Sequence, residues 1–283
     1  MSKRLYQPSY VQEILQKYDF YFKKSLGQNF LIDGNIVGDI VEKSGIQEDD
    51  VVLEIGPGIG VLTEELSSKA KFVYSVEIDK NAVEILKDTL KDYDNIEIIP
   101  GDILKTDLKK IYEKNHQKLK VVANLPYYVT TPILAYLMEH KDDISQITVM
   151  IQKEVAQRIV SEKDSKQYSS LSVFLQYHSD PRILMDVPRT VFMPKPNVDS
   201  AVLELKLKEK RSDVPEDILF PLVRTAFNQR RKTILNSMTS GDLNLSKEEL
   251  RDILKNLGIS PKARAENLSV EDFINIAKGI AND

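Results

Sequence analysis

Short segments rich in β-branched residues alternate with segments of helical periodicity through the middle of this 283-residue chain. Five of the former have the length and composition of buried strands, at residues 51–55, 72–76, 96–99, 120–123 and 147–151. Helical stretches at 61–68 and 81–91 occupy the first two gaps between them. This alternation predicts a parallel sheet with helices on both faces.

Two more strands are predicted further along, at residues 182–187 and 201–207. The proline-rich segment 191–198 (Val-Phe-Met-Pro-Lys-Pro-Asn-Val) lies between them and is too short for a crossover helix. We therefore expect this last pair of strands to be antiparallel.

Both ends of the chain are predicted to be helical. Near the N-terminus, segment 11–18 is amphipathic, and segment 36–44 follows Asp33, a residue type that caps helices. Beyond a charged linker at 208–213, the expected helices are 219–227, 232–237, 247–257 and 270–278. The expected organisation is an α/β domain with an N-terminal helical extension, residues 1–207, and a small all-helical C-terminal domain, residues 208–283.

Composition limits the chemistry available to this chain. It has no cysteine, which excludes disulfides, thiolate metal sites and cysteine nucleophiles. The three histidines (His116, His140, His178) are far apart in polar stretches, so neither a metal site nor a Ser-His-Asp triad is expected. No apolar run approaches the length of a membrane span, and the N-terminus lacks the apolar part of a signal peptide. A cytoplasmic protein is therefore expected.

A glycine-rich turn follows the first predicted strand. Glu54 precedes Gly56, Gly58 and Gly60, which are spaced Gly-x-Gly-x-Gly before a helix. Such glycines permit a tight turn close to a bound group, and the helix N-terminus offers free N–H donors. The spacing differs from the Gly-x-Gly-x-x-Gly of dinucleotide sites, and an anion before the turn suits a cationic amino acid better than a phosphate. The turn therefore favours S-adenosylmethionine, a nucleoside with a methionine tail.

Acidic residues follow the next two strands. Glu77 could accept both ribose hydroxyls, and Asp102 could accept the adenine amino group; their neighbours Ile78 and Ile103 complete the predicted cofactor site. Such acids can also simply cap helices, as Asp79 is expected to do. Suitable groups at three successive strand ends favour the cofactor site. We therefore predict a Rossmann-like class I methyltransferase sheet, mostly parallel with an antiparallel last strand.

The fourth predicted strand runs into Asn124, Leu125, Pro126 and Tyr127. The amino nitrogen of adenine is a poor nucleophile because its lone pair is delocalised into the ring. The Asn124 side-chain oxygen and the Leu125 carbonyl could accept its two hydrogens and localise that pair, while Pro126 fixes the backbone. Tyr127 offers a ring on which an extruded base can stack. Alone, the tetrapeptide would indicate a strand-end turn with a core tyrosine; behind the glycine turn and two acids it predicts methylation of an adenine amino group.

With these two motifs the chain resembles the rRNA adenine dimethyltransferase family, and further segments extend the likeness over nearly its whole length. These are residues 24–31 (Lys-Ser-Leu-Gly-Gln-Asn-Phe-Leu), 131–132 (Thr-Pro), 192–200 (Phe-Met-Pro-Lys-Pro-Asn-Val-Asp-Ser), 227–233 (Phe-Asn-Gln-Arg-Arg-Lys-Thr) and 264–268 (Arg-Ala-Glu-Asn-Leu). The likeness is closest to bacterial members that dimethylate two adjacent adenosines in the 3′-terminal hairpin of 16S rRNA.

The resemblance implies an S-adenosylmethionine-dependent enzyme that acts on 16S rRNA in precursor particles of the small ribosomal subunit and takes part in their biogenesis. It also implies a set of cofactor contacts: Asn29, Leu31, Gly56, Glu77, Asp102 and Asn124. Phe192 would be a second aromatic wall, opposite Tyr127. One departure is Tyr128, where many members carry Asn, which puts fine positioning of the substrate in doubt but not the reaction.

The net charge of −4 is unusual for an RNA-binding protein, but the charge is unevenly distributed. Residues 181–240 hold eleven basic and seven acidic side chains. Part of this surplus is a cluster predicted to contact RNA phosphates, which Lys23 and Lys24 could extend: Arg224, Arg230, Arg231 and Lys232. The alternative is a solvated helix face, the usual environment of a charge run.

Other functions stay open at this point. A 23S rRNA adenine methyltransferase of the macrolide-resistance type would use the same chemistry, although the longer segments around residues 27–31 and 192–198 favour the small-subunit enzyme. A non-catalytic RNA-binding assembly factor could retain the fold, but the intact residues 124–127 argue against loss of catalysis. DNA adenine methylation would require a target-recognition domain, and none is recognisable. Nothing in the sequence suggests an obligate interface, so a monomer is expected.

Overall fold

The computed structural model describes residues 3–23, 26–209, 213–239 and 245–282. Contacts within the chain divide it into two compact units. One consists of Met1–Ala156 and Arg182–Leu207, and the other of Gln157–Pro181 and Lys208–Asp283. Each unit buries its own cluster of apolar side chains.

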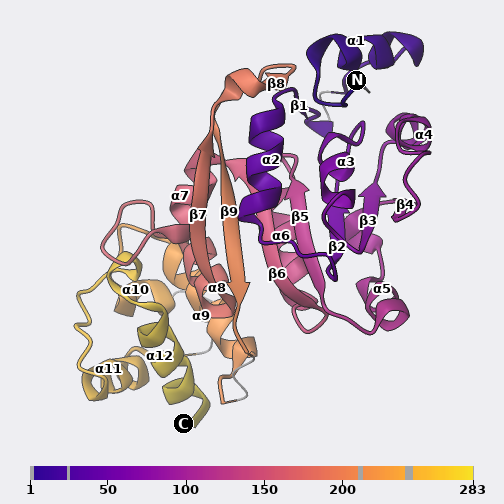
Figure 1. Ribbon diagram of the computed structural model, residues 1–283. Coiled ribbons are helices and arrows are strands. Elements are labelled where there is room, and N and C mark those ends of the chain that lie inside the picture. Colours follow the sequence, from indigo (N-terminus) through magenta and orange to yellow (C-terminus); the bar gives the residue numbers. More distant parts are fainter. Residues whose placement is uncertain (1–2, 24–25, 210–212, 240–244, 283) are drawn as a thin grey trace. The chain divides into compact units, whose positions relative to one another are not determined.

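A seven-stranded sheet contains all seven predicted strands, in the order β4-β3-β2-β5-β6-β9-β7 (Figure 1). Their bounds are β2 Val51–Ile55, β3 Phe72–Glu77, β4 Ile96–Pro100, β5 Leu119–Asn124, β6 Ile144–Gln152, β7 Ser179–Val187 and β9 Ser200–Leu207. Pairings from β4 through β6 are all parallel, so the predicted parallel sheet is confirmed.

The far side of the sheet reverses direction, as expected. β9 pairs antiparallel with β6, with Gln152 opposite Ser200. The N–H of Lys208 donates to the carbonyl of His178 over 2.9 Å, which places the end of β9 beside the start of β7. The connection between these two strands contains no α-helix of the kind that usually links parallel strands.

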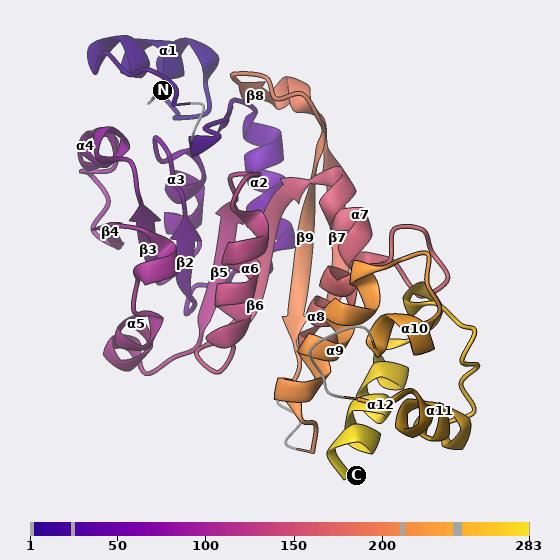
Figure 2. The ribbon, with the colours of Figure 1, turned by 180° about the vertical axis from the view of Figure 1, so that it is seen from behind.

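Helices cover both faces of the sheet, with α2 and α6 on opposite sides (Figure 2). In the first unit the helices are α1 Pro8–Lys17, α2 Gly34–Lys43, α3 Val61–Ser67, α4 Lys80–Thr89, α5 Leu108–Asn115 and α6 Thr130–Glu139, followed by α7 Lys153–Val160 at the unit boundary. Asp33 caps α2, since its side chain accepts the N–H groups of Asn35 and Ile36. The predicted cap is confirmed.

A small two-stranded ribbon was not predicted from the sequence. β1 (Phe30–Leu31) pairs antiparallel with β8 (Phe192–Met193), so that Leu31 lies opposite Phe192. The N–H of Ile32 extends this contact by donating to the Val191 carbonyl over 2.9 Å. The ribbon joins the two segments 24–31 and 192–200 that the sequence singled out separately.

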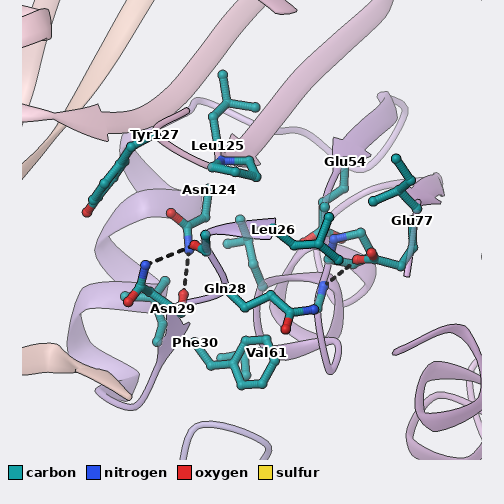
Figure 3. A pocket seen from close by; sticks show the side chains of 18 of the residues that line it. Leu26, Gln28, Asn29, Phe30, Glu54, Val61, Glu77, Asn124, Leu125 and Tyr127 are labelled. Carbon is teal, nitrogen blue, oxygen red and sulfur yellow. Dashed lines mark hydrogen bonds between the residues drawn. The ribbon is translucent and has the colours of Figure 1, made fainter. Parts of the chain in front are cut away.

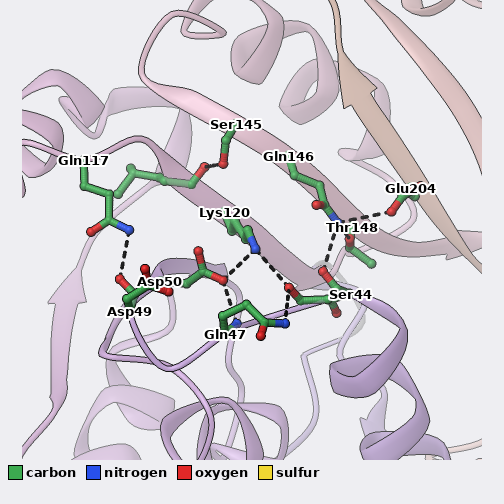
Figure 4. A network of polar contacts seen from close by, with 12 residues as sticks. Ser44, Gln47, Asp49, Asp50, Gln117, Lys120, Ser145, Gln146, Thr148 and Glu204 are labelled. Carbon is green, nitrogen blue, oxygen red and sulfur yellow. Dashed lines mark hydrogen bonds and ion pairs between the residues drawn. The ribbon is translucent and has the colours of Figure 1, made fainter.

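At the amino ends of the strands, polar side chains hold one another (Figure 4). The Lys120 ammonium lies 2.6 Å from Asp50 and 2.9 Å from the Gly45 carbonyl. The Gln146 amide donates to the Ser44 carbonyl and to Glu204. These contacts fasten the turn before β2 to β5, and the end of α2 to β6.

The second unit is helical. Its helices are α8 Ser170–His178, α9 Glu216–Asn228, α10 Ile234–Met238, α11 Lys247–Asn256 and α12 Val270–Asn282. The predicted boundary lies after residue 207, but the contacts also assign residues 157–181 to this unit. The reason is burial of Tyr168, Val173 and Tyr177 in the same apolar cluster as Leu222 and Phe273. Among the described residues, no helix combines the length and the apolar character needed to cross a membrane.

Candidate active site

A pocket lies at the carboxyl ends of β2, β3 and β5, where parallel strands present their ligands (Figure 3). Eleven of the predicted site residues line it: Asn29, Leu31, Glu54, Gly56, Gly58, Glu77, Ile78, Asn124, Leu125, Pro126 and Tyr127. The fold therefore brings the glycine turn, the acid at the end of β3 and the Asn-Leu-Pro-Tyr segment into one cavity.

Four predicted residues are not among those that line this pocket: Gly60, Asp102, Ile103 and Phe192. Gly60 is the N-cap of α3, with a φ of 94° that favours glycine. Asp102 caps a short 3-10 turn by accepting the N–H of Leu104 over 3.0 Å. Phe192 is only 3% exposed and belongs to the core of the first unit. Their contacts with cofactor or base stay predictions.

The pocket is also lined by residues that were not predicted from the sequence: Leu26, Gly27, Gln28, Phe30, Pro57, Val61, Leu62 and Tyr128. Several lie inside the segment 24–31 or directly after Tyr127, so their place beside a motif was an available signal. Val61 and Leu62 gave none, because apolar residues at a helix start are usually core.

The glycine turn is shaped by close packing as well as by backbone conformation. Gly58 has a φ of 62°, and a Cβ built there would lie 2.7 Å from a ring carbon of Phe30. A larger residue would therefore displace Phe30 from the wall of the pocket.

Glu54 is a buried acid in the wall of the pocket, with 1% of its surface exposed. Burial raises its pKa to about 7, opposed by a hydrogen bond from the Ser75 hydroxyl over 3.1 Å. No ion pair to Glu54 is found within the described parts of the chain. A cation placed beside it would be attracted to its charged form.

Glu77 is held by the backbone on both oxygens. The N–H of Gly58 donates to one oxygen over 3.1 Å, and the N–H of Asp79 donates to the other over 2.8 Å. Burial raises the pKa of Glu77, and these two hydrogen bonds oppose the shift. Each carboxylate oxygen can still accept a second hydrogen bond, as the predicted ribose contact requires.

Asn124 has its side-chain amide oriented by the N-terminal segment. Its NH2 group donates to the carbonyl of Asn29 over 3.1 Å, while the Asn29 side chain donates to the Gly27 carbonyl (Figure 3). This network assigns the amide nitrogen, so the oxygen is the atom presented to the pocket. The N–H of Leu125 donates to the Met150 carbonyl over 3.0 Å, which fixes the next peptide.

Tyr127 lines the pocket with its ring and is tethered at its hydroxyl. That hydroxyl lies 2.7 Å from the Ser200 hydroxyl at the start of β9. Burial raises the pKa of Tyr127, so the phenol stays neutral at physiological pH. The neighbouring Tyr128 is 58% exposed at the same pocket.

The predicted RNA-contacting residues have varied environments. Lys23 forms an ion pair with the buried Asp79 at 2.7 Å, and Lys24 lies outside the described residues. Arg230 donates to the Lys166 and Tyr168 carbonyls and lies 3.6 Å from Glu266, all within the second unit. The remaining three members of the cluster are exposed: Arg224, Arg231 and Lys232.

The sheet order, the glycine turn and the acid-lined pocket define a class I methyltransferase. A family model described as "Ribosomal RNA adenine dimethylase" matches residues 19–282. The chain belongs to this family.

Curated relatives span the same length. The chain is 46% identical to "Ribosomal RNA small subunit methyltransferase A" of Alkaliphilus oremlandii (strain OhILAs), with 98% of each chain covered. It is 47% identical to the protein of that name in Clostridioides difficile (strain 630), covering 95% of this chain and 94% of that one. A solved dimethyladenosine transferase from Plasmodium falciparum aligns with a TM-score of 0.74 and 28% identity, over 87% of this chain and 95% of that one.

Proposed function

We propose that the protein transfers methyl groups from S-adenosylmethionine to the exocyclic amino groups of two adjacent adenosines in the 3′-terminal hairpin of 16S rRNA. Each adenosine is dimethylated, in precursor particles of the small ribosomal subunit. The observation that carries the proposal is a sequence identity of 46–47%, over nearly the full length of the chain, with relatives named small subunit methyltransferases. The orientation of Asn124 supports the acceptor chemistry independently.

S-adenosylmethionine suits the residues of the pocket. The turn at Gly58 has no room for a side chain, and Glu54 is a buried acid without a cationic partner among the described residues. Glu54 would face the cationic part of the cofactor, Glu77 the ribose hydroxyls, and Ile78 the adenine. Asn29 and Leu31 would cover the bound cofactor, and Asp102 and Ile103 would contact its adenine. When bound, the cofactor supplies an electrophilic methyl group on a sulfonium.

Asn124 prepares the nucleophile. Its side-chain oxygen and the Leu125 carbonyl accept the two amino hydrogens of the target adenine, which localises the nitrogen lone pair. Because the Asn124 NH2 group is occupied by Asn29, the amide does not need to reorient before the reaction. The site needs no strong general base, because the proton can leave after methyl transfer.

The target base stacks on Tyr127, whose position Ser200 fixes. Phe192 serves as the second wall only if its buried ring is uncovered when RNA binds. Arg224, Arg231 and Lys232 contact phosphates, whereas Arg230 contributes mainly through its bonds inside the second unit. We further propose that the protein works as a monomer in the cytoplasm.

Mass spectrometry of rRNA from cells with and without the gene tests the proposal. We expect the loss of four methyl groups from two adjacent adenosines of 16S rRNA. A side-by-side assay with purified small-subunit particles and 23S rRNA separates the alternatives. Exclusive labelling of 23S rRNA would support the macrolide-resistance type, and no labelling of either would support a non-catalytic factor.

A further inference from the structure

Asp79, two residues beyond the end of β3, has contacts other than those with the helix that it caps. Its side chain is buried, and it accepts a hydrogen bond from the N–H of Asn81 over 3.1 Å, which is the cap of α4. It also accepts the Lys23 ammonium over 2.7 Å and the Gln28 side-chain amide over 2.8 Å. A cap alone would leave these last two contacts unexplained.

Both partners belong to, or lead into, the segment that walls the pocket. We define the N-terminal strap as residues 26–31, every one of which lines the pocket. Gln28 lies inside the strap, and its side chain also accepts the N–H of Lys23 over 2.9 Å. Lys23, Gln28 and Asp79 therefore form a closed triangle at the base of the strap.

The same carboxylate is coupled to the cofactor residues through the backbone. The N–H of Asp79 donates to Glu77, whose other oxygen accepts the N–H of Gly58. At its other end the strap accepts the Asn124 amide on the Asn29 carbonyl. One continuous set of hydrogen bonds thus connects the strap with the glycine turn, Glu77 and Asn124.

The charge state of Asp79 suits a lasting contact with Lys23 and Gln28. Burial alone would raise its pKa, but the hydrogen bonds from Lys23 and Gln28 outweigh burial and lower it. The carboxylate is therefore charged at every physiological pH, and Lys23 is partly neutralised by it. That pairing competes with the RNA contact expected of Lys23 from the sequence.

We propose that Asp79 is a positioning residue for cofactor binding, which latches the N-terminal strap over the pocket through Lys23 and Gln28. This rests on the proposed use of S-adenosylmethionine. Asp79 is not among the residues that line the pocket, and it acts through the strap and through Glu77. Lys23 accordingly belongs to the latch and not to the RNA surface.

The test compares two helix caps in the full-length protein. Asp79→Ala removes a cap and the latch, whereas Asp33→Ala removes a cap alone, because Asp33 holds only Asn35 and Ile36 among the described residues. The affinity for S-adenosylhomocysteine is measured by calorimetry. We expect about a tenfold weaker affinity for Asp79→Ala, as for loss of an ordered wall, and a change within about twofold for Asp33→Ala. Equal affinities in the two variants would overturn the latch.

Two further measurements separate positioning from general destabilisation. In methyl transfer, Asp79→Ala should raise the KM for S-adenosylmethionine and leave kcat unchanged at saturating cofactor. Lys23→Ala and Gln28→Ala should each weaken cofactor affinity about threefold, with no added loss in the Asp79→Ala background. Additive losses, or weaker RNA binding by Lys23→Ala with normal cofactor affinity, would contradict the latch.

The outcomes also distinguish the latch from the proposed function. Failure of the wild-type protein to bind S-adenosylhomocysteine would remove the proposed cofactor, whatever the Asp79 variant does. If Asp79→Ala does not fold, Lys23→Ala and Gln28→Ala still test the latch, because both side chains are partly exposed.

Discussion

The two ends of the central strands are both polar, but their polar groups are satisfied in opposite ways. At the amino ends, Lys120 pairs with Asp50, and Gln146 reaches Ser44 and Glu204 (Figure 4). At the carboxyl ends, Glu54 and Glu77 are buried and accept hydrogen bonds from hydroxyl and backbone N–H groups, and neither has an ion pair among the described residues (Figure 3).

This difference separates scaffold from site within single strands. β5 begins with Leu119, whose carbonyl accepts the Ser145 hydroxyl, and Lys120, whose ammonium pairs with Asp50. It ends with Asn124, whose side-chain oxygen is presented to the pocket. Polar groups that are paired within the protein stabilise the fold. Buried charged groups that lack a counter-charge lower its stability and are suited to bind a ligand. Changes at the carboxyl ends should therefore alter binding and catalysis, and changes at the amino ends only stability.

The largest effect is expected for Asn124→Ala. Loss of the acceptor oxygen should lower kcat for methyl transfer by at least about 10²–10³-fold, the usual cost of removing one preorganised polar group. Affinity for S-adenosylhomocysteine should stay measurable, because Glu54 and Glu77 are untouched. A near-wild-type rate in single-turnover assays would show that Asn124 is not the acceptor.

Glu54→Gln should change stability next most strongly, and in the favourable direction. Burial raises the pKa of Glu54 from its ordinary value of 4.5 to about 7, so the folded protein loses stability as pH rises from 4.5 through 7. Above that window the wild type should be less stable than Glu54→Gln by up to about 3 kcal/mol. Urea unfolding at pH 5 and pH 8 measures this, and equal differences at both pH values would contradict it.

The same variant tests whether Glu54 binds the amino acid tail of the cofactor. The α-ammonium group of the amino acid tail favours the charged carboxylate of Glu54, so the affinity for S-adenosylhomocysteine should rise about tenfold from pH 6 to pH 8 in the wild type. Glu54→Gln should lose this dependence. Methylthioadenosine, which lacks the amino acid tail, is the control and should bind independently of pH in both proteins.

Tyr127→Ala should have a smaller effect, of about 1–3 kcal/mol in kcat/KM for RNA, the range for one base stacked on an aromatic ring. Tyr127→Phe keeps the ring and loses only the bond to Ser200, so a change of a few-fold is expected. Should Phe and Ala prove equally damaging, the hydroxyl and not the ring would be the important group.

The smallest effect belongs to the other end of the strands. Lys120→Ala removes an ion pair whose side chains are 19% and 13% exposed, which should cost about 1 kcal/mol of unfolding free energy. Asp50 would keep its bond from the Gln47 N–H. Methyl transfer at saturating substrates should be unchanged, and a loss of kcat comparable to that of Tyr127→Ala would erase the distinction between the two ends.

Much of the molecule follows from local sequence. Segment 51–55 is β2, and 201–207 lies within β9, because strand periodicity and β-branched residues are local signals. The carboxyl-edge site was also predictable, since parallel strands carry their ends to one edge whatever their detailed packing. Glu54, Glu77 and Asn124 could therefore be selected without coordinates.

What the sequence could not provide depends on contacts between distant residues. The pairing of Leu31 with Phe192, the burial of the Phe192 ring, and the assignment of residues 157–181 to the helical unit are all long-range. So is the partner of Lys23: a lysine before a glycine-rich segment looks like a solvated cation until the fold brings the buried Asp79 to 2.7 Å. Local periodicity and residue chemistry determined the sheet, the glycine turn and the acceptor segment, whereas only the tertiary structure decided which charges were already paired, because pairing depends on distance in space.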